Sequence, residues 1–195
     1  RGLAFFGLVS MYGQHYTFTA DGSHPGIPLV LESDVAALPA RNTVKEVYAQ
    51  AIADLTKGVS LMTMDRNRPY MMSKSGAQAL LSRIYLYMED FNNSVVMADA
   101  VINSGKYSLV STSNYVSQFV TGGSSEAIFE LFYSSVDNPG NEGLSGMYRA
   151  TGYGDYLPSK DLLNLIPAGD VRHQMFIVDP KLAGIYASQR VNKWP

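Results

Sequence analysis

The chain lacks cysteine altogether, although it is 195 residues long. Without a thiol there is no disulfide framework, no thiolate zinc site and no cysteine nucleophile. An excess of charge of one sign is also lacking, because 15 Lys plus Arg stand against 17 Asp plus Glu. A dedicated nucleic-acid-binding protein needs basic side chains to neutralise phosphates. The formal net charge of -2 therefore argues against that class of protein.

Long apolar runs are missing as well. No run approaches the ~18 residues of a membrane-spanning helix, and no secretory signal pattern is present. The chain begins with Arg1 instead of Met, inside an apolar, helix-like run that has no capping residue before it. Residues 190–195 resemble the start of a strand. We therefore expect an interior piece of a longer protein, with its N- and C-terminal parts outside this sequence.

The common catalytic patterns are absent too. The three histidines, His15, His24 and His173, are too far apart for a helical zinc motif, and no nucleophile elbow, P-loop or dinucleotide fingerprint occurs. Asp21 and His24 could hold a metal, but a polar pair among Gly, Ser and Pro is more typical of turn chemistry. We expect a protein that is not an enzyme and that has no metal and no cofactor.

What the sequence does contain is helical periodicity in its first half. The boundaries carry recognisable signals: a capping box at Thr43 and Glu46, N-cap residues at Ser73 and Asp90, and a glycine stop at Gly105. Apolar residues recur between these signals at the helical spacing. The expected helices lie at residues 1–12, 43–59, 73–88 and 90–104.

The last two of these helices form a hairpin, because only a tight turn separates them. On the tetratricopeptide template, small, aromatic and packing positions are filled by Ser82, Tyr85, Phe91, Ser94 and Ala98. One such hairpin cannot bury both of its faces and needs neighbours. Phe91, Val95, Ala98, Val101 and Ile102 are expected to form the apolar face of its second helix.

The second half of the chain has a different character. Residues 127–133 are apolar and aromatic enough for a buried strand, and Ser159 caps a short helix. Between them, residues 134–158 are expected to form a long ordered surface loop, and a loop of that length in a compact domain is usually functional or disordered. We predict a tetratricopeptide-like helical scaffold at residues 1–112. A loop-rich region with short strands and a short helix should follow at 113–195.

Tyrosine is the informative excess, with 13 Tyr against 1 Trp. Neither helical nor strand periodicity accounts for Tyr148, Tyr153 and Tyr156. Aromatic faces beside Asn, Asp and Arg suit sugar rings, which stack on them while their hydroxyls form hydrogen bonds. They also suit peptides, or they could brace the loop itself. By loop position and chemistry the candidate ligand-binding residues are Tyr148, Arg149, Tyr153, Asp155 and Tyr156, with Asn138 and Asn141 second.

Seven motifs in order give the chain a family resemblance. They are Leu3–Gly13, Thr19–Val30, Ala40–Leu55, Ala79–Met88, Glu126–Leu131, Pro158–Leu162, and Gly169–Arg172 together with Asn192–Pro195. In this order they resemble the SusD/RagB family of nutrient-binding outer-membrane lipoproteins of Gram-negative bacteria. No invariant ligand motif of that family can be carried over, because its binding residues vary with the nutrient.

The resemblance implies both fold and role. The fold would be mainly α, a SusD-like superhelix of tetratricopeptide-like helix pairs with an inserted loop-rich region that contains short β-strands. Such proteins are lipid-anchored at the cell surface and act as lids on a TonB-dependent transporter of the SusC type. They capture glycans or, in some members, peptides, without covalent chemistry. The anchor, at the mature N-terminus, would lie upstream of Arg1.

Two alternatives to glycan capture stay open. Peptide binding on the same scaffold is favoured by the absence of a loop tryptophan, since Trp194 lies in one of the family motifs. A tetratricopeptide adaptor for protein partners would instead show further repeats at about 34-residue spacing. The loop-rich second half has no such spacing.

Overall fold

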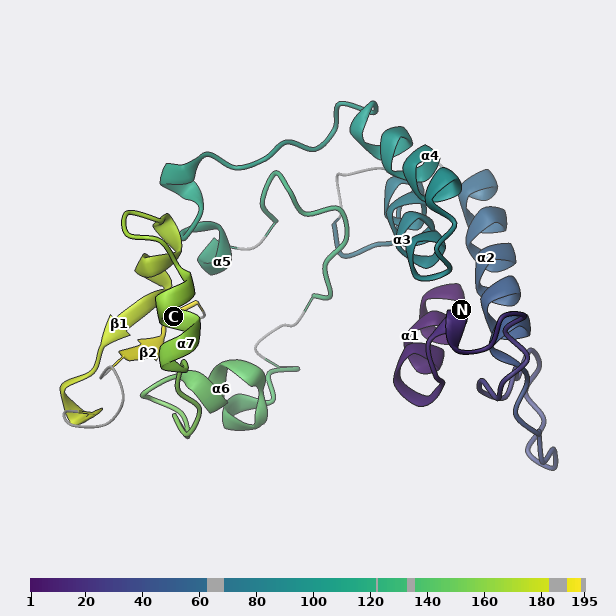
Figure 1. Ribbon diagram of the computed structural model, residues 1–195, viewed down its shortest axis with the longest axis horizontal. Helices are drawn as coiled ribbons and strands as arrows, with labels where there is room; N and C mark the ends of the chain where they lie inside the picture. Colours follow the sequence, from purple (N-terminus) through teal and green to yellow (C-terminus); the bar gives the residue numbers. More distant parts are fainter. Residues whose placement is uncertain (63–68, 122, 133–135, 183–188, 194–195) are drawn as a thin grey trace. The chain divides into compact units, whose positions relative to one another are not determined.

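The computed structural model describes residues 1–62, 69–121, 123–132, 136–182 and 189–193. These residues form two compact units. The first unit comprises residues 1–107 together with 128–130, and the second comprises residues 108–127 and 131–195. The fold is mainly helical with two short strands (Figure 1). Among the described helices, none is both long and apolar enough to cross a membrane. The predicted division into residues 1–112 and 113–195 stays a prediction.

The first unit contains the four helices that the sequence predicts. They are α1 (Gly2–Tyr12), α2 (Val44–Leu61), α3 (Lys74–Tyr87) and α4 (Phe91–Ile102). The capping box of α2 is formed, with Thr43 Oγ1 accepting from the Glu46 amide at 3.2 Å and a Glu46 oxygen accepting from the Thr43 amide at 2.8 Å. Ser73 caps α3 by accepting from the Gly76 amide at 3.0 Å. Local signals therefore set these helix starts.

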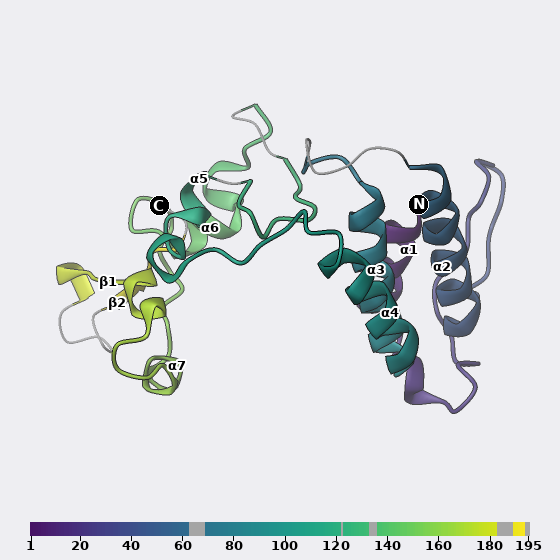
Figure 2. The ribbon, with the colours of Figure 1, turned by 90° about the horizontal axis from the view of Figure 1, so that it is seen from above.

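The apolar core of the first unit lies between these helices. In Figures 1 and 2, α3 runs between α2 and α4, and α1 packs against α2. The largest fully buried side chains are Val9, Val44, Val47 and Ile84, which come from α1, α2 and α3. Phe6 meets Tyr48 edge-on, with ring centroids 5.8 Å apart. The apolar stripes of the sequence thus converge on one core.

The predicted helix hairpin is present, and two serines join its helices. Ser82 Oγ donates to the Ser94 carbonyl at 2.8 Å, and Ser94 Oγ donates to the Ser82 carbonyl at 2.9 Å. The expected apolar face of α4 is only partly buried. Val101 is buried, whereas Phe91, Val95 and Ile102 are exposed. Among the described elements α3 is the main neighbour of α4, so the side of α4 that faces away from α3 stays open.

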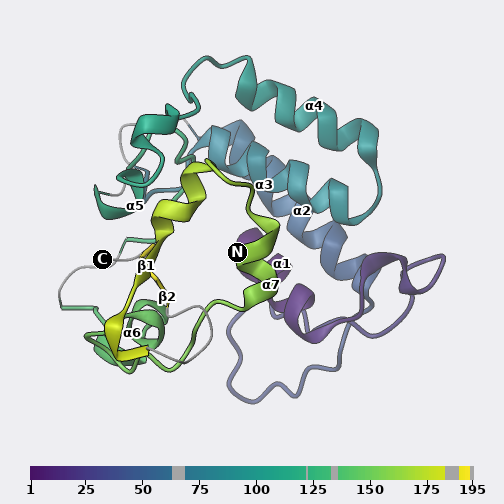
Figure 3. The ribbon, with the colours of Figure 1, turned by 60° about the vertical axis from the view of Figure 1, so that its left-hand side comes forward.

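The second unit consists of short elements. They are α5 (Gln118–Thr121), α6 (Leu144–Tyr148) and α7 (Lys160–Leu165), four 3-10 turns, at Thr112–Asn114, Gly140–Glu142, Val171–Met175 and Pro180–Leu182, and strands β1 (Phe176–Val178) and β2 (Gln189–Val191). The strands pair antiparallel, with Ile177 opposite Arg190 (Figures 1 and 3). Ser159 caps α7 as predicted, accepting from the Leu162 amide at 3.1 Å. The strand expected near the end of the chain is confirmed at Arg190 and Val191, while Trp194 and Pro195 lie outside the described residues.

The strand expected at residues 127–133 is wrong for its described part, 127–132. The Ala127 amide donates within a turn to Ser124, and the Glu130 amide donates to the Pro69 carbonyl at 2.9 Å. Those bonds do not make a ladder, which needs a partner strand alongside. Leu131 and Phe132 are exposed, so the apolar character of this run does not reflect burial in a sheet.

Candidate ligand-binding site

Residues 138–156, here called the 138–156 loop, fold back on themselves within the second unit. The Tyr153 amide donates to the Gly146 carbonyl at 2.8 Å, and the Tyr156 amide donates to the Met147 carbonyl at 3.3 Å. The sequence predicts a loop throughout this stretch, but the structure places α6 and the 3-10 turn Gly140–Glu142 inside it. Tyr148 accordingly ends a short helix.

Glycines make this compact turn possible. A Cβ atom on Gly152 would lie 2.2 Å from the Gly146 carbonyl oxygen, and a Cβ on Gly146 would lie 2.5 Å from the Asn141 carbonyl oxygen. Only glycine allows backbones to approach so closely. The 138–156 loop therefore has a defined conformation in which segments of its backbone are in direct contact.

The three candidate tyrosines lie on this framework in different environments. The rings of Tyr148 and Tyr156 have centroids 5.7 Å apart at an interplanar angle of 40°. Tyr148 is half-buried, whereas Tyr153 and Tyr156 are 53% and 56% exposed. The half-buried Tyr148 thus packs against Tyr156, and Tyr153 and Tyr156 remain exposed.

A carboxylate that sequence reasoning missed belongs to the same place. The Tyr153 hydroxyl donates to Glu142. This bond is the main reason that the pKa of Tyr153 is raised, followed by burial and by the negative charge of Asp155. Glu142 and Asp155 therefore both act on the Tyr153 hydroxyl. Glu142 lies 11 residues before Tyr153, and no periodicity signals that pairing.

Arg190 joins this loop to β2, which was also not foreseen. Its Nη1 donates to the Gly154 carbonyl, and its Nε donates to Asp179. The side chains of Arg190 and Asp179 are only 12% and 10% exposed. The Arg190 bond is the main cause that lowers the pKa of Asp179. Gly154 has a φ of +63°, and a Cβ there would lie 2.7 Å from Arg190 Nη1.

The remaining predicted site residues, Asn138, Asn141 and Arg149, have structural contacts of their own or are partly buried. Asn138 Oδ1 accepts from the Gly140 amide at 2.9 Å, so this side chain shapes the turn. Asn141 is exposed, and its backbone lies beneath Gly146. Arg149 is half-buried, with its Nε out of contact with solvent. Tyr153, Asp155 and Tyr156 are thus exposed neighbours in sequence on the 138–156 loop, and the assignment of all seven stays a prediction.

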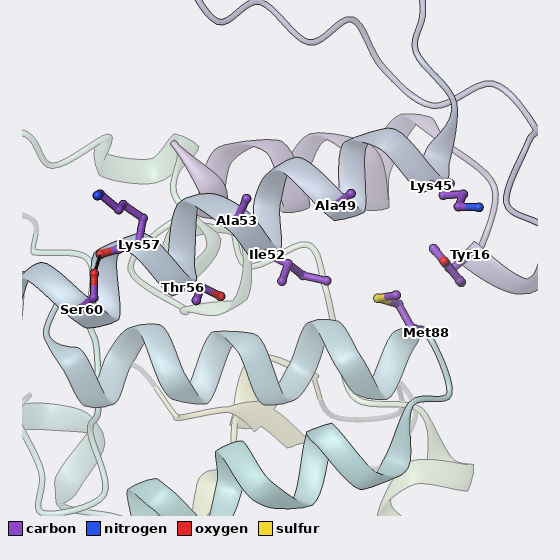
Figure 4. Close-up of a pocket in the computed structure, with 9 residues that line it drawn as sticks. All are labelled: Tyr16, Lys45, Ala49, Ile52, Ala53, Thr56, Lys57, Ser60 and Met88. Atoms are coloured by element: carbon purple, nitrogen blue, oxygen red, sulfur yellow. Dashed lines mark hydrogen bonds between the residues drawn. The ribbon is translucent and has the colours of Figure 1, made fainter.

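The first unit offers a different kind of concavity. An open groove of about 690 Å³ runs along one face of α2. In Figure 4, Ile52 lies between the ribbons of α2 and α3, and Tyr16 and Met88 lie at one end. The Ser60 hydroxyl is already bonded to the Lys57 carbonyl at 2.7 Å. Because the floor is largely apolar, this groove suits a hydroxyl-rich ligand less well than the 138–156 loop does.

Asp21 and His24 behave as turn residues. Asp21 Oδ1 accepts from the Ser23 amide at 3.1 Å. The buried His24 ring contacts the Thr19 hydroxyl at 2.8 Å and the Gln14 carbonyl at 3.3 Å. Within the described part of the chain, no three His, Asp or Glu side chains converge on a possible metal position.

Comparisons with known proteins agree with this architecture. A family model described as starch-binding and associating with the outer membrane matches residues 1–86. A putative sugar-binding protein from Bacteroides vulgatus shares 30% identity at a TM-score of 0.87, over 100% of this chain and 44% of its own. A SusD superfamily protein from Bacteroides thetaiotaomicron shares 28% identity at a TM-score of 0.85, over 100% of this chain and 46% of its own.

A laminarin-binding SusD-like protein has the same fold at 20% identity, with a TM-score of 0.70 over 100% of this chain and 50% of its own. No curated protein sequence matches this chain significantly. The chain spans less than half the length of the first two solved relatives. The family model, the two similar structures and the helical scaffold lead to one conclusion: the chain belongs to the SusD/RagB family.

Proposed function

We propose that this protein binds a nutrient glycan at the surface of the outer membrane and passes it, chemically unchanged, to a TonB-dependent transporter of the SusC type. The observation that carries the proposal is the pair of exposed tyrosines, Tyr153 and Tyr156, on the 138–156 loop, whose backbone is held by internal hydrogen bonds. The family model adds support, because its description names both starch binding and the outer membrane.

The physical basis is stacking combined with hydrogen bonds. Exposed aromatic faces bind the C–H faces of sugar rings, and nearby carboxylates accept from sugar hydroxyls. Glu142 and Asp155 supply such acceptors beside Tyr153. A few contacts of this kind on an open surface give moderate, reversible affinity, which suits a protein that must release its ligand to a transporter.

The partners follow from the family. We expect a lipid anchor to hold the protein at the outer membrane and a SusC-like transporter to receive the ligand. Fractionation of the source cells should place the protein in the outer membrane. Purification under mild detergent should recover a TonB-dependent transporter with it. Recovery of the protein alone, in a soluble fraction, would contradict this part of the proposal.

A binding experiment tests the glycan itself. The full-length protein is applied to a broad glycan array, and the best oligosaccharide is then titrated by calorimetry. We expect Tyr156→Ala to weaken binding by about tenfold, or about 1.4 kcal/mol. The matched control is Tyr12→Ala, which removes an exposed tyrosine of the first unit and should leave the affinity unchanged.

The same titration separates the possible outcomes. The oligosaccharide should be recovered intact after incubation, since a binding protein leaves its ligand uncleaved. Binding of peptides in place of glycans would favour the peptide-binding version of the function. Glycan binding that is equal in Tyr156→Ala and the wild type would overturn the site but not the function.

A further inference from the structure

The open side of the 138–156 loop has an uneven distribution of charge. Glu142 and Asp155 are both exposed, and Glu142 accepts the hydrogen bond of the Tyr153 hydroxyl. Asp155 follows Tyr153 by two residues, and its negative charge also contributes to the raised pKa of Tyr153. A ligand that stacks on Tyr153 therefore meets two carboxylates at its edge.

The positive side chains of this region are less exposed than its carboxylates. Arg149 is the single basic residue between positions 138 and 156, and its Nε is buried. Arg190 reaches the loop from β2, but its Nε is bonded to Asp179 and its Nη1 to the Gly154 carbonyl. With a side chain only 12% exposed, Arg190 serves the protein's own carboxylate and backbone.

Recognition of an anionic sugar requires the opposite arrangement. Carboxylate and sulfate groups are bound by exposed guanidinium or ammonium groups, most strongly through paired hydrogen bonds. The exposed charged groups beside Tyr153 are instead the carboxylates of Glu142 and Asp155, which accept hydrogen bonds and do not donate them. Neutral sugars fit it well, because their hydroxyls donate to carboxylates in charge-assisted hydrogen bonds.

We infer that the 138–156 loop selects uncharged glycans and rejects those that carry carboxylate or sulfate groups, through Glu142 and Asp155 beside Tyr153. This inference rests on the proposed function and names the ligand class of the same site. The repulsion acts through solvent, so it weakens as salt screens it.

The experiment uses the full-length protein on an array of neutral, uronic-acid and sulfated glycans. The best neutral oligosaccharide is then titrated beside its C6-oxidised form, in which carboxylates replace the primary hydroxyls, at 20 mM and 500 mM NaCl. We expect array hits among neutral glycans. The oxidised form should bind at least about tenfold more weakly at low salt, and the difference should shrink at high salt.

Charge-neutral variants test the named residues. In the double variant Glu142→Gln/Asp155→Asn, the affinity ratio between the neutral and the oxidised ligand should fall by at least about threefold. The matched control is Glu32→Gln/Asp99→Asn, which removes two exposed carboxylates of the first unit and should leave that ratio as in the wild type.

The outcomes distinguish this inference from the function on which it rests. Preferential binding of anionic glycans, or a ratio that responds neither to salt nor to the double variant, would overturn the selectivity alone. The absence of binding to any glycan would overturn both the selectivity and the proposed function. Loss of binding in Tyr156→Ala together with a salt-dependent ratio would support both.

Discussion

The first unit buries a continuous apolar cluster that includes Val9, Val47 and Ile84, whereas the second unit buries few apolar side chains among its described residues, namely Ile166, Met175 and Leu182. In place of a large core, the second unit uses backbone hydrogen bonds, glycine contacts and the Arg190–Asp179 pair. The difference shows how one chain can combine a scaffold with a shaped loop. Apolar packing gives the scaffold its stability, and specific polar contacts give the loop its geometry.

The largest expected effect lies in the apolar core. Ile84→Ala removes a fully buried side chain of α3 and should lower the free energy of unfolding by about 3 kcal/mol. Leu86→Ala, on the exposed side of the same helix, should change it by less than about 0.5 kcal/mol. Urea unfolding followed by circular dichroism measures both values. Equal effects would mean that α3 does not bury the face described here.

Replacing a glycine with alanine should impair glycan binding in the second unit and stabilise the fold in the first. Gly152→Ala places a Cβ 2.2 Å from the Gly146 carbonyl oxygen, so the loop must shift and glycan affinity should fall by about tenfold or more. Gly7→Ala, in α1 with no atom within 4 Å of the new Cβ, should raise the free energy of unfolding by about 0.5 to 1 kcal/mol. Calorimetry and urea unfolding report the two outcomes. A Gly152→Ala protein with full affinity would show that the backbone contact is dispensable.

Two of the arginine–aspartate pairs, one in each unit, offer a pH test of the same contrast. Arg190 lowers the pKa of Asp179, so the stabilisation is present above the unfolded pKa of about 3.9 and is lost as pH falls through the folded value. Near-UV circular dichroism between pH 5 and 2 should show the loop loosening. In Arg190→Met this transition should disappear from the profile, because the loop has already lost its partner.

The matched substitution in the first unit is Arg1→Met. Arg1 pairs with Asp54 and also lowers its pKa, but the Arg1 side chain is 49% exposed. Exposed ion pairs contribute little to stability. We therefore expect Arg1→Met to leave the thermal midpoint nearly unchanged. If Arg1→Met lowered the thermal midpoint more than Arg190→Met does, the comparison between the two units would be reversed.

The smallest effect should come from the Tyr153 hydroxyl. Tyr153→Phe keeps the aromatic ring and removes the hydrogen bond to Glu142. Because the ring face supplies the stacking, glycan affinity should change by no more than about threefold. Calorimetry measures the affinity of this variant and of Tyr153→Ala, and the affinity of Tyr153→Ala should fall further. Equal losses in the two variants would assign the binding to the hydroxyl.

The sequence predicts the first unit well because its signals are local. Caps at Thr43, Ser73 and Asp90, joined to apolar periodicity, define helices without knowledge of their partners. The template also placed Ser82 and Ser94 at small positions of the hairpin, but their reciprocal hydrogen bonds emerged only from the structure. The family resemblance in the sequence rested on the order of seven motifs, which needs no structural knowledge.

The second unit was harder to predict because its contacts are distant in sequence. Helix α6 is too short and glycine-rich for periodicity to show it. The strand expected at 127–133, of which residues 128–130 belong to the first unit, has no partner strand along its described part. Arg190 meets the Gly154 carbonyl across 36 residues. The closely spaced glycines at 146, 152 and 154 were the available signal of tight backbone packing.

The most direct test of the account is a crystal structure of the full-length protein with the best oligosaccharide from the array. We predict a sugar ring stacked on Tyr156 or Tyr153, with hydroxyls donating to Glu142 or Asp155. An oligosaccharide bound only in the first unit, for example in the groove along α2, would contradict the assignment of glycan capture to the 138–156 loop.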